Sequence, residues 1–168
     1  MKRREFIKAG GATAGSTGIA INGFFNRSFT FEFWLNPKKF IEPEATEDID
    51  DINEWTEKKY EYSRDPFLGL YDTIKPVEQF INDKTGDCDD YARFALSWLV
   101  HRNKTAYLTF TVTENYSLHL FVHDGIRAYD DFGVGNIGWN KDDAVFYREK
   151  KVNDGERKQN PTPEIQQD

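Results

Sequence analysis

The chain has 168 residues, of which 38% are hydrophobic and 30% charged, and its 29 acidic residues outnumber its 22 basic ones. The resulting formal charge of −7 argues against nucleic acid as a partner. A single cysteine excludes an internal disulfide. The length is enough for one small domain with one hydrophobic core.

The first residues carry an export pattern. The chain begins M-K-R-R-E-F-I-K, which matches the twin-arginine motif R-R-x-F-[LI]-K. Residues 9–25 are small and mildly apolar, and they fall short of a transmembrane helix of about 20 apolar residues. We expect residues 1–27 to be a twin-arginine signal peptide, which places the protein outside the cell or in the cell envelope, with membrane attachment only through an uncleaved signal. A disordered basic tail is the alternative.

Short elements are predicted between this signal and the cysteine. Residues 29–33 alternate phenylalanine with polar side chains, which indicates a short strand or a segment that packs on the domain. Residues 46–62 are predicted to form a helix capped by Thr46, because acidic side chains gather at its start and lysines near its end. Residues 63–73 form a predicted loop, which would line a substrate groove if the protein is an enzyme. Pro76 begins a short helix.

The only cysteine opens the next predicted helix. Gly86 ends the preceding segment and Asp87 is a suitable N-cap, so Cys88 lies in the first helical turn. Apolar residues then recur at helical spacing and predict one buried face: Tyr91, Phe94, Ala95, Trp98 and Leu99. The helix dipole favours a reactive thiolate at Cys88. The three acidic neighbours favour the opposite, an inert thiol, and a lone cysteine is commonly a small buried apolar residue.

Strands are predicted after this helix. Residues 106–113 are rich in β-branched and aromatic side chains. Residues 118–123 and 126–130 read as a hairpin around Asp124-Gly125, and a two-residue loop would set His119 directly opposite Asp130. Both would then lie on a mostly apolar face together with Ile126, as a working pair or as a satisfied structural one.

The end of the chain is predicted to leave the domain. Residues 144–147 are a candidate edge strand. Residues 148–168 are dominated by charged side chains and include two prolines, so we expect a disordered tail.

A thiol at a helix N-terminus, an imidazole and an orienting carboxylate are the three parts of a cysteine acyl-transfer site. The stretch G-D-C-D-D-Y-A at residues 86–92, a histidine at the start of a strand and Y-D-D at residues 129–131 together resemble the transglutaminase-like cysteine peptidase superfamily. The cysteine motif is most similar to the bacterial branch that reads G-D-C-[DE]-D-Y-A. The resemblance covers about residues 76–131. Leu120 departs from it, because the family often has a small residue after the histidine, and this bears on the shape of the acyl pocket.

The resemblance implies an α+β fold with a papain/transglutaminase-like core, in which the cysteine helix packs on a small antiparallel sheet within a catalytic domain of residues 28–147. It implies an exported cysteine enzyme, a peptidase in the first place, that acts on amide bonds of protein or peptide substrates. Cys88 would be the nucleophile, His119 the base and Asp130 the orienting acid. The alternatives are a cross-linking transglutaminase and a secreted binding or assembly module without turnover.

Fewer features point to cofactors. We expect a monomer with no required cofactor. In the branch that the motif resembles, carboxylates beside the cysteine can bind calcium, which makes Asp87 and Asp89 candidate ligands, with helix capping as the competing role for Asp87. The backbone N–H of Cys88 is the expected oxyanion donor, and Gln79 is a candidate second donor by residue type alone.

Overall fold

The computed structural model describes residues 28–63, 73–113, 118–136 and 144–155. The α+β class is confirmed, with helices α3 (Ser28–Leu35), α4 (Ile52–Lys59), α5 (Val77–Asp83) and α6 (Cys88–His101), and with short 3-10 helices at Pro37–Lys39 and Pro43–Thr46. Two short strands, β1 (Glu61–Tyr62) and β2 (Thr85–Gly86), pair in parallel. The signal peptide and most of the predicted 63–73 loop lie outside the described residues.

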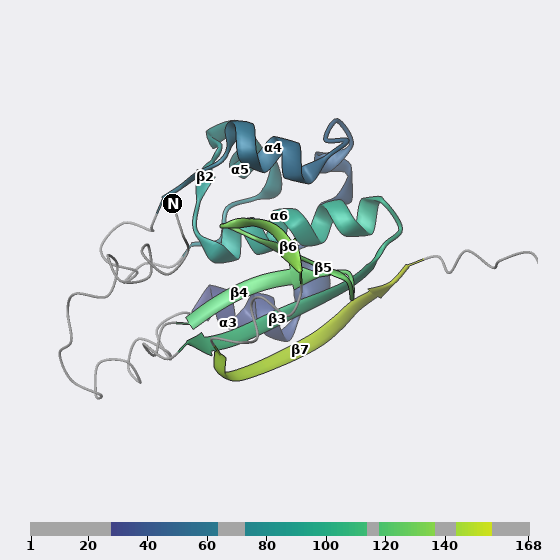
Figure 1. The fold of residues 1–168 in the computed structure, drawn as a ribbon. Helices are drawn as coiled ribbons and strands as arrows, with labels where there is room; N and C mark the ends of the chain where they lie inside the picture. The colour runs from purple at the N-terminus through teal and green to yellow at the C-terminus, as the bar shows by residue number, and fades with distance from the viewer. Residues whose placement is uncertain (1–27, 64–72, 114–117, 137–143, 156–168) are drawn as a thin grey trace, which may run out of the picture.

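An antiparallel sheet forms the second layer. It contains β3 (Thr105–Thr113), β4 (Leu118–His123), β5 (Arg127–Asp130), β6 (Gly133–Asn136) and β7 (Ala144–Asp154), in the order β6-β5-β4-β3-β7. Helix α6 lies across one face of this sheet, and α4 and α5 cover the side of α6 that faces away from the sheet (Figure 1). The first turn of α6 therefore lies where the helices and the sheet meet.

The core is built around α6. The helical face predicted from its periodicity is buried, and Tyr91, Phe94 and Leu99 are fully enclosed. Trp55 of α4 and Phe80 of α5 meet Phe94 with ring centroids 4.7 and 5.2 Å away. Burial of each such side chain contributes about 1.5–3 kcal/mol, so α6 is held from both sides and its N-terminus is well positioned.

The segment at residues 29–33 is helical, so the predicted strand is wrong. Phe33 is fully buried and its neighbour Trp34 packs against Phe110 of β3, with ring centroids 6.0 Å apart. Consecutive residues of a strand point to opposite faces, whereas consecutive residues of a helix can both face one surface. Because both aromatic rings contact the domain, α3 suits this segment better than a strand does.

The helix predicted at residues 46–62 is shorter in the structure. Asp51 caps α4, because its Oδ1 accepts from the amides of Asn53 and Glu54 at 2.8 and 3.2 Å. Thr46 instead ends a 3-10 helix, and its hydroxyl donates to the Pro43 carbonyl at 2.8 Å. Both Thr46 and Asp51 are suitable N-caps, and Asp51, which directly precedes the buried residues Ile52 and Trp55, caps the helix.

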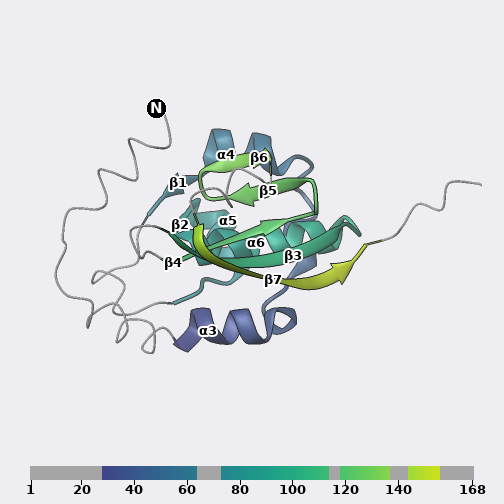
Figure 2. The same ribbon diagram turned by 60° about the horizontal axis from the view of Figure 1, so that its bottom comes forward.

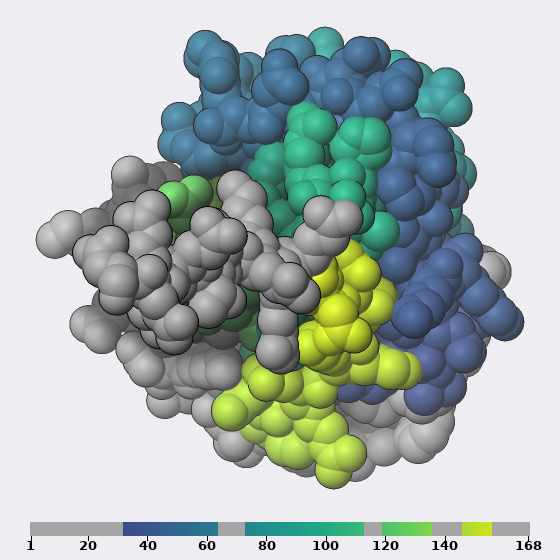
Figure 3. Space-filling view, turned by 90° about the vertical axis from the view of Figure 1, so that its right-hand side faces the viewer, coloured from purple at the N-terminus to yellow at the C-terminus, as the bar shows by residue number. Residues whose placement is uncertain are grey.

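Residues 148–154 belong to the sheet, in contrast to the disordered tail expected from their charge. The eleven residues of β7 pair along the whole of β3. Arg148 and Glu149 are exposed while Val152 is buried, and charged side chains are common on edge strands. Figure 3 shows β7, in yellow, beside the segment that follows α3, in blue, and Lys150 donates to the Leu35 carbonyl at 2.6 Å.

The helices that the structure describes include none with the length and apolar character needed to cross a membrane.

Candidate active site

The cysteine lies at the first position of α6, as the sequence predicts. Asp87 is the N-cap, and its carboxylate accepts from the amide of Asp89 at 3.4 Å. The Asp89 carboxylate in turn accepts from the amide of Asp90 at 2.9 Å. These contacts satisfy amides of the first turn that have no partner within the helix. Cys88 is half-buried there, with part of its surface open.

The residue before the N-cap has to be small. A Cβ on Gly86 would lie 2.6 Å from Oδ2 and 2.8 Å from Cβ of Asp90, and 2.9 Å from the ring of Phe80. Asp90 itself is fixed by the amide of Lys75, which donates to its Oδ1 at 2.6 Å, and the Tyr60 hydroxyl donates to the Gly86 carbonyl at 2.9 Å. The glycine of the motif therefore allows β2 to pass close to α6.

We expect Gly86→Ala to destabilise the protein by about 1–3 kcal/mol, since the added methyl group must displace packed atoms. Chemical denaturation with tryptophan fluorescence measures the change. Thr85→Ala, which shortens a side chain of the same strand, is the matched control and should change the stability by less. Equal midpoints for wild type and Gly86→Ala would contradict the close approach.

The histidine and the aspartate are brought together, although not by the predicted register. Nε2 of His119 lies 3.1 Å from both carboxylate oxygens of Asp130. The Asp130 side chain is fully buried, and that of His119 is 13% exposed. A carboxylate that accepts a hydrogen bond from one ring nitrogen fixes the tautomer and the orientation of the imidazole.

The hairpin between them is longer than predicted. Val122 pairs with Tyr129 and His123 with Ala128, so the loop spans residues 124–127. The Asp124 carboxylate accepts from the amides of Ile126 and Arg127 at 2.9 and 2.7 Å, a local turn that adds two residues to the loop.

This register changes which residues share a face. Carried one pair further, it sets Asp130 opposite Phe121, so that His119 and Asp130 are diagonal neighbours on one face, where long side chains still meet. Ile126, predicted to face the core, lies in the loop and is 73% exposed.

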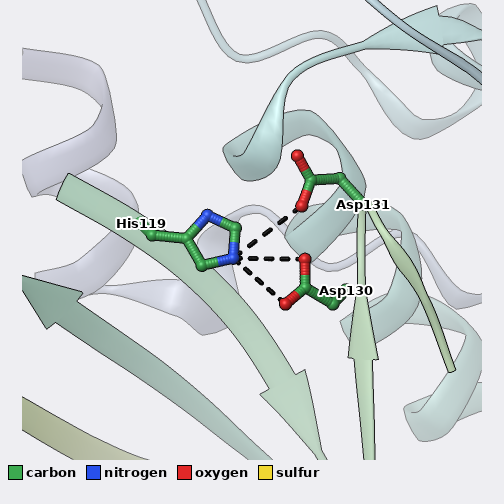
Figure 4. Close-up of side chains that lie close together, drawn as sticks. All are labelled: His119, Asp130 and Asp131. Atoms are coloured by element: carbon green, nitrogen blue, oxygen red, sulfur yellow. Dashed lines mark hydrogen bonds and ion pairs between the residues drawn. The ribbon is translucent and has the colours of Figure 1, made fainter. Parts of the chain in front are cut away.

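A second carboxyl group adjoins this pair. Oδ1 of Asp131 lies 3.8 Å from Nε2 of His119, and the Asp131 side chain is only 2% exposed. Both aspartates converge on Nε2, while Nδ1 of the ring points away from them (Figure 4). Burial, then the hydrogen bond to Asp130 and the charge of that residue, raise the pKa of Asp131 well above its ordinary value. Asp131 is the last residue of the Y-D-D motif, and the sequence alone predicts no role for it.

The thiol of Cys88 is held in its neutral form. Burial is the largest of the effects that raise its pKa well above the ordinary value, and the charges of Asp87 and Asp89 add to it. Burial and these acidic neighbours favour the neutral thiol, so the sulfur needs a base to become a thiolate.

The Cys88 sulfur lies close to the strand that carries His119. The backbone of Leu120 is hydrogen-bonded to the thiol, and this bond lowers the thiol pKa against the larger effects that raise it. Leu120 follows His119 in β4, so the sulfur lies beside the peptide that joins the two residues. The structure thus pairs His119 with Asp130 and brings Cys88 to the same strand.

Among the residues that the structure describes, two groups of side chains each place three potential metal donors within 4.8 Å of one another. Their members are Asp87, Asp89 and Asp90 in the first group and His119, Asp130 and Asp131 in the second. Protein contacts already engage the first group, whose carboxylates accept backbone amides, and Asp130 engages His119. A calcium ion at Asp87 and Asp89 would therefore compete with backbone amides for these carboxylates. Gln79 is exposed and bonds to Asp83 at 3.4 Å, which accounts for its side chain without an oxyanion role.

A half-buried cysteine at a helix N-terminus, packed on a sheet in which a histidine bonds to a buried carboxylate, is compatible with a cysteine acyl-transfer type of site. A family model described as a transglutaminase-like domain matches residues 37–127, more than half of the chain. The chain belongs to this transglutaminase-like domain family. The match includes Cys88 and His119 and ends before Asp130. No curated protein and no solved structure matches the chain.

Proposed function

We propose that this protein is an exported cysteine acyl-transfer enzyme that hydrolyses amide bonds in proteins or peptides. The observation that carries the proposal is the hydrogen bond between Nε2 of His119 and the buried carboxylate of Asp130. The residue after His119 is Leu120, whose backbone is hydrogen-bonded to the Cys88 thiol. A buried imidazole–carboxylate pair is costly in a small domain unless it is fully satisfied or has a function. Its place beside the only cysteine supports a function.

The first half-reaction forms an acyl-enzyme. Nδ1 of His119 accepts the thiol proton as the sulfur of Cys88 attacks the amide carbonyl and a C–S bond forms. Asp130 holds Nε2–H and stabilises the imidazolium. Nδ1 then donates the proton to the leaving nitrogen while the C–N bond breaks, which releases the amine and leaves a thioester on the cysteine.

The second half-reaction decides the class of enzyme. Water that attacks the thioester gives a peptidase, whereas a lysine amine gives a transglutaminase. In both, His119 removes the proton from the attacking group and returns it to the sulfur. The amide of Cys88, at a helix N-terminus, is the proposed donor to the oxyanion of each tetrahedral intermediate.

The raised thiol pKa supports proton transfer during the attack. Since burial and the acidic neighbours favour the neutral thiol, a resting thiolate–imidazolium pair is not the ground state of this proposal. His119 instead acts as a general base in each turnover.

The remaining parts of the proposal concern location and partners. Residues 1–27 are proposed to direct export through the twin-arginine route, so that the enzyme acts as a monomer outside the cytoplasm. Its substrates are proteins or peptides, its surface charge disfavours nucleic acid, and the chemistry above requires no cofactor. Calcium at Asp87 and Asp89 remains an expectation that calorimetric titration checks.

The test is product analysis. A mixture of unfolded proteins is incubated with the wild-type protein or with Cys88→Ala, and mass spectrometry identifies the products. We expect new chain termini with the wild type and a loss of about 10⁴-fold or more in Cys88→Ala, because the nucleophile is missing. Cross-linked peptides in place of new termini would identify a transglutaminase. Identical, unchanged spectra would favour a binding module.

A further inference from the structure

We propose that Asp131 is a positioning residue of this site, which shares one proton with Asp130 and so holds the Asp130 carboxylate against His119. The inference rests on the proposed function and extends it to a residue outside the predicted triad. It assigns the two aspartates of Y-D-D different roles: Asp130 carries the negative charge and Asp131 carries the proton.

The geometry of the two carboxyl groups supports this division. Asp130 contacts Nε2 of His119 with both oxygens at 3.1 Å, whereas Asp131 stays at 3.8 Å, beyond a hydrogen bond (Figure 4). An oxygen of Asp131 lies within 4.8 Å of an oxygen of Asp130, and interaction with Asp130 is among the causes that raise the pKa of Asp131. Two buried carboxylates this close repel each other strongly when both are ionised, so a single proton held by the pair relieves the repulsion.

The environment of Asp131 favours the neutral acid. Its side chain is 2% exposed, and its buried Oδ1 has no hydrogen-bond donor among the described residues. Titratable groups face it from each element packed against it. They are Asp130 of β5, His119 of β4, Asp87 and Cys88 at the start of α6, Tyr91 within α6 and Tyr60 after α4. His119 is the only member of this set able to carry a positive charge, and Asp130 already holds it.

This arrangement has a consequence for the chemistry. With one proton shared, the pair presents a single negative charge to the imidazolium that forms when Cys88 loses its proton. A second charge on Asp131 would lie beside both His119 and the developing thiolate, and would oppose ionisation of the sulfur. The proton donated by Asp131 also fixes the rotamer of Asp130, as orienting partners do for active-site carboxylates.

The kinetic test uses three variants and iodoacetamide alkylation of Cys88 at neutral pH. We expect Asp131→Leu to slow alkylation at least about tenfold, because misplacement of a catalytic group has effects of this size. Asp131→Asn, whose amide can still donate to Asp130, should recover most of that loss. Unchanged rates in Asp131→Leu would overturn the positioning role. A defect in Asp131→Asn as large as that of Asp130→Ala would overturn it as well, because Asp131 would then be the ionised partner.

The second arm is independent of catalysis. The stability contributed by a carboxyl whose pKa is raised by folding is fully present below its unfolded pKa of about 3.9, and it is lost progressively as the pH rises from there through the folded pKa. The melting temperature of Asp131→Asn should therefore rise relative to wild type between pH 4 and pH 8. A gap that is constant over this range would overturn the shared proton. Failure of the proposed function can be told apart from failure of this inference, because His119→Ala tests the base directly. If the proposed function is wrong, the alkylation rate does not depend on His119, whereas the melting temperatures still report on the protonation of Asp131.

Discussion

Replacement of His119 by alanine is expected to slow alkylation of Cys88 at neutral pH by about 100-fold or more. Burial and the charges of Asp87 and Asp89 raise the pKa of the thiol and favour its neutral form in the resting protein, and only the thiolate reacts rapidly with iodoacetamide. His119 is the base proposed to remove the proton, and a well-placed general base contributes roughly 10²–10⁴-fold. Mass spectrometry of the alkylated protein as a function of time measures the rate.

The control for this prediction is His101→Ala. His101 is a half-buried histidine at the end of the same helix, far along the chain from the cysteine. Its loss should leave the rate within about threefold of wild type, the level of effect expected for a residue outside the site. Asp130→Asn should give an intermediate rate, since the imidazole remains but its tautomer is no longer enforced. Equal rates in wild type and His119→Ala would contradict the proposed base.

The cysteine helix could be predicted because its signals are local. Asp87 caps the helix with its own side chain, and the spacing of Tyr91, Phe94 and Leu99 predicts a helix with a buried face. In the structure the whole of residues 89–99 is buried, because other elements cover both sides of α6. Such features depend on residues within a few positions of one another, and the surrounding fold reinforces them. The identities of His119 and Asp130 as partners were predicted for a similar reason, because adjacent strands leave few ways to arrange them.

The hairpin register could not be predicted from the turn dipeptide alone. Asp124-Gly125 favours a two-residue loop, but the Asp124 carboxylate captures two backbone amides and shifts the pairing by two residues. A shift of two preserves the face of each side chain, which is why His119 and Asp130 still meet. Shifts of one residue would have separated them.

Other features depend on contacts between distant segments. The sequence of α3 has the alternation of a strand, and the contact of Trp34 with Phe110 of β3, which favours a helix, is between distant segments. The charged residues of β7 are typical of a disordered tail, but they pair with the edge of β3 in the folded protein. The role of Asp131 depends on burial and on its distance from His119, which no local pattern specifies.

Arg93 is a buried cation of α6 that no pattern in the sequence marks as important. Among the substitutions considered for stability, its loss should have the largest effect. Its guanidinium donates to the carbonyls of Phe40 at 2.8 Å and Lys75 at 2.9 Å, and pairs with Glu42 at 2.5 Å. The other oxygen of Glu42 accepts from the amide of Val77 at 2.7 Å. This network joins the segment before α4, the start of α5 and the middle of α6.

We expect Arg93→Met to lower the free energy of unfolding by about 2–4 kcal/mol, because the partly exposed carboxylate of Glu42 and two carbonyls lose the buried guanidinium that donates to them. Lys58→Met is the matched control. Lys58 forms an exposed pair with Glu54 one helical turn away, and its loss should change the stability by about 0.5 kcal/mol or less. Urea denaturation of both variants measures the difference, and a loss below about 1 kcal/mol in Arg93→Met would contradict the network. Because Arg93 lies little more than one turn after Cys88 in α6, a folded but loosened Arg93→Met should also alkylate with altered kinetics, which links the anchoring of this helix to the reactivity of its first residue.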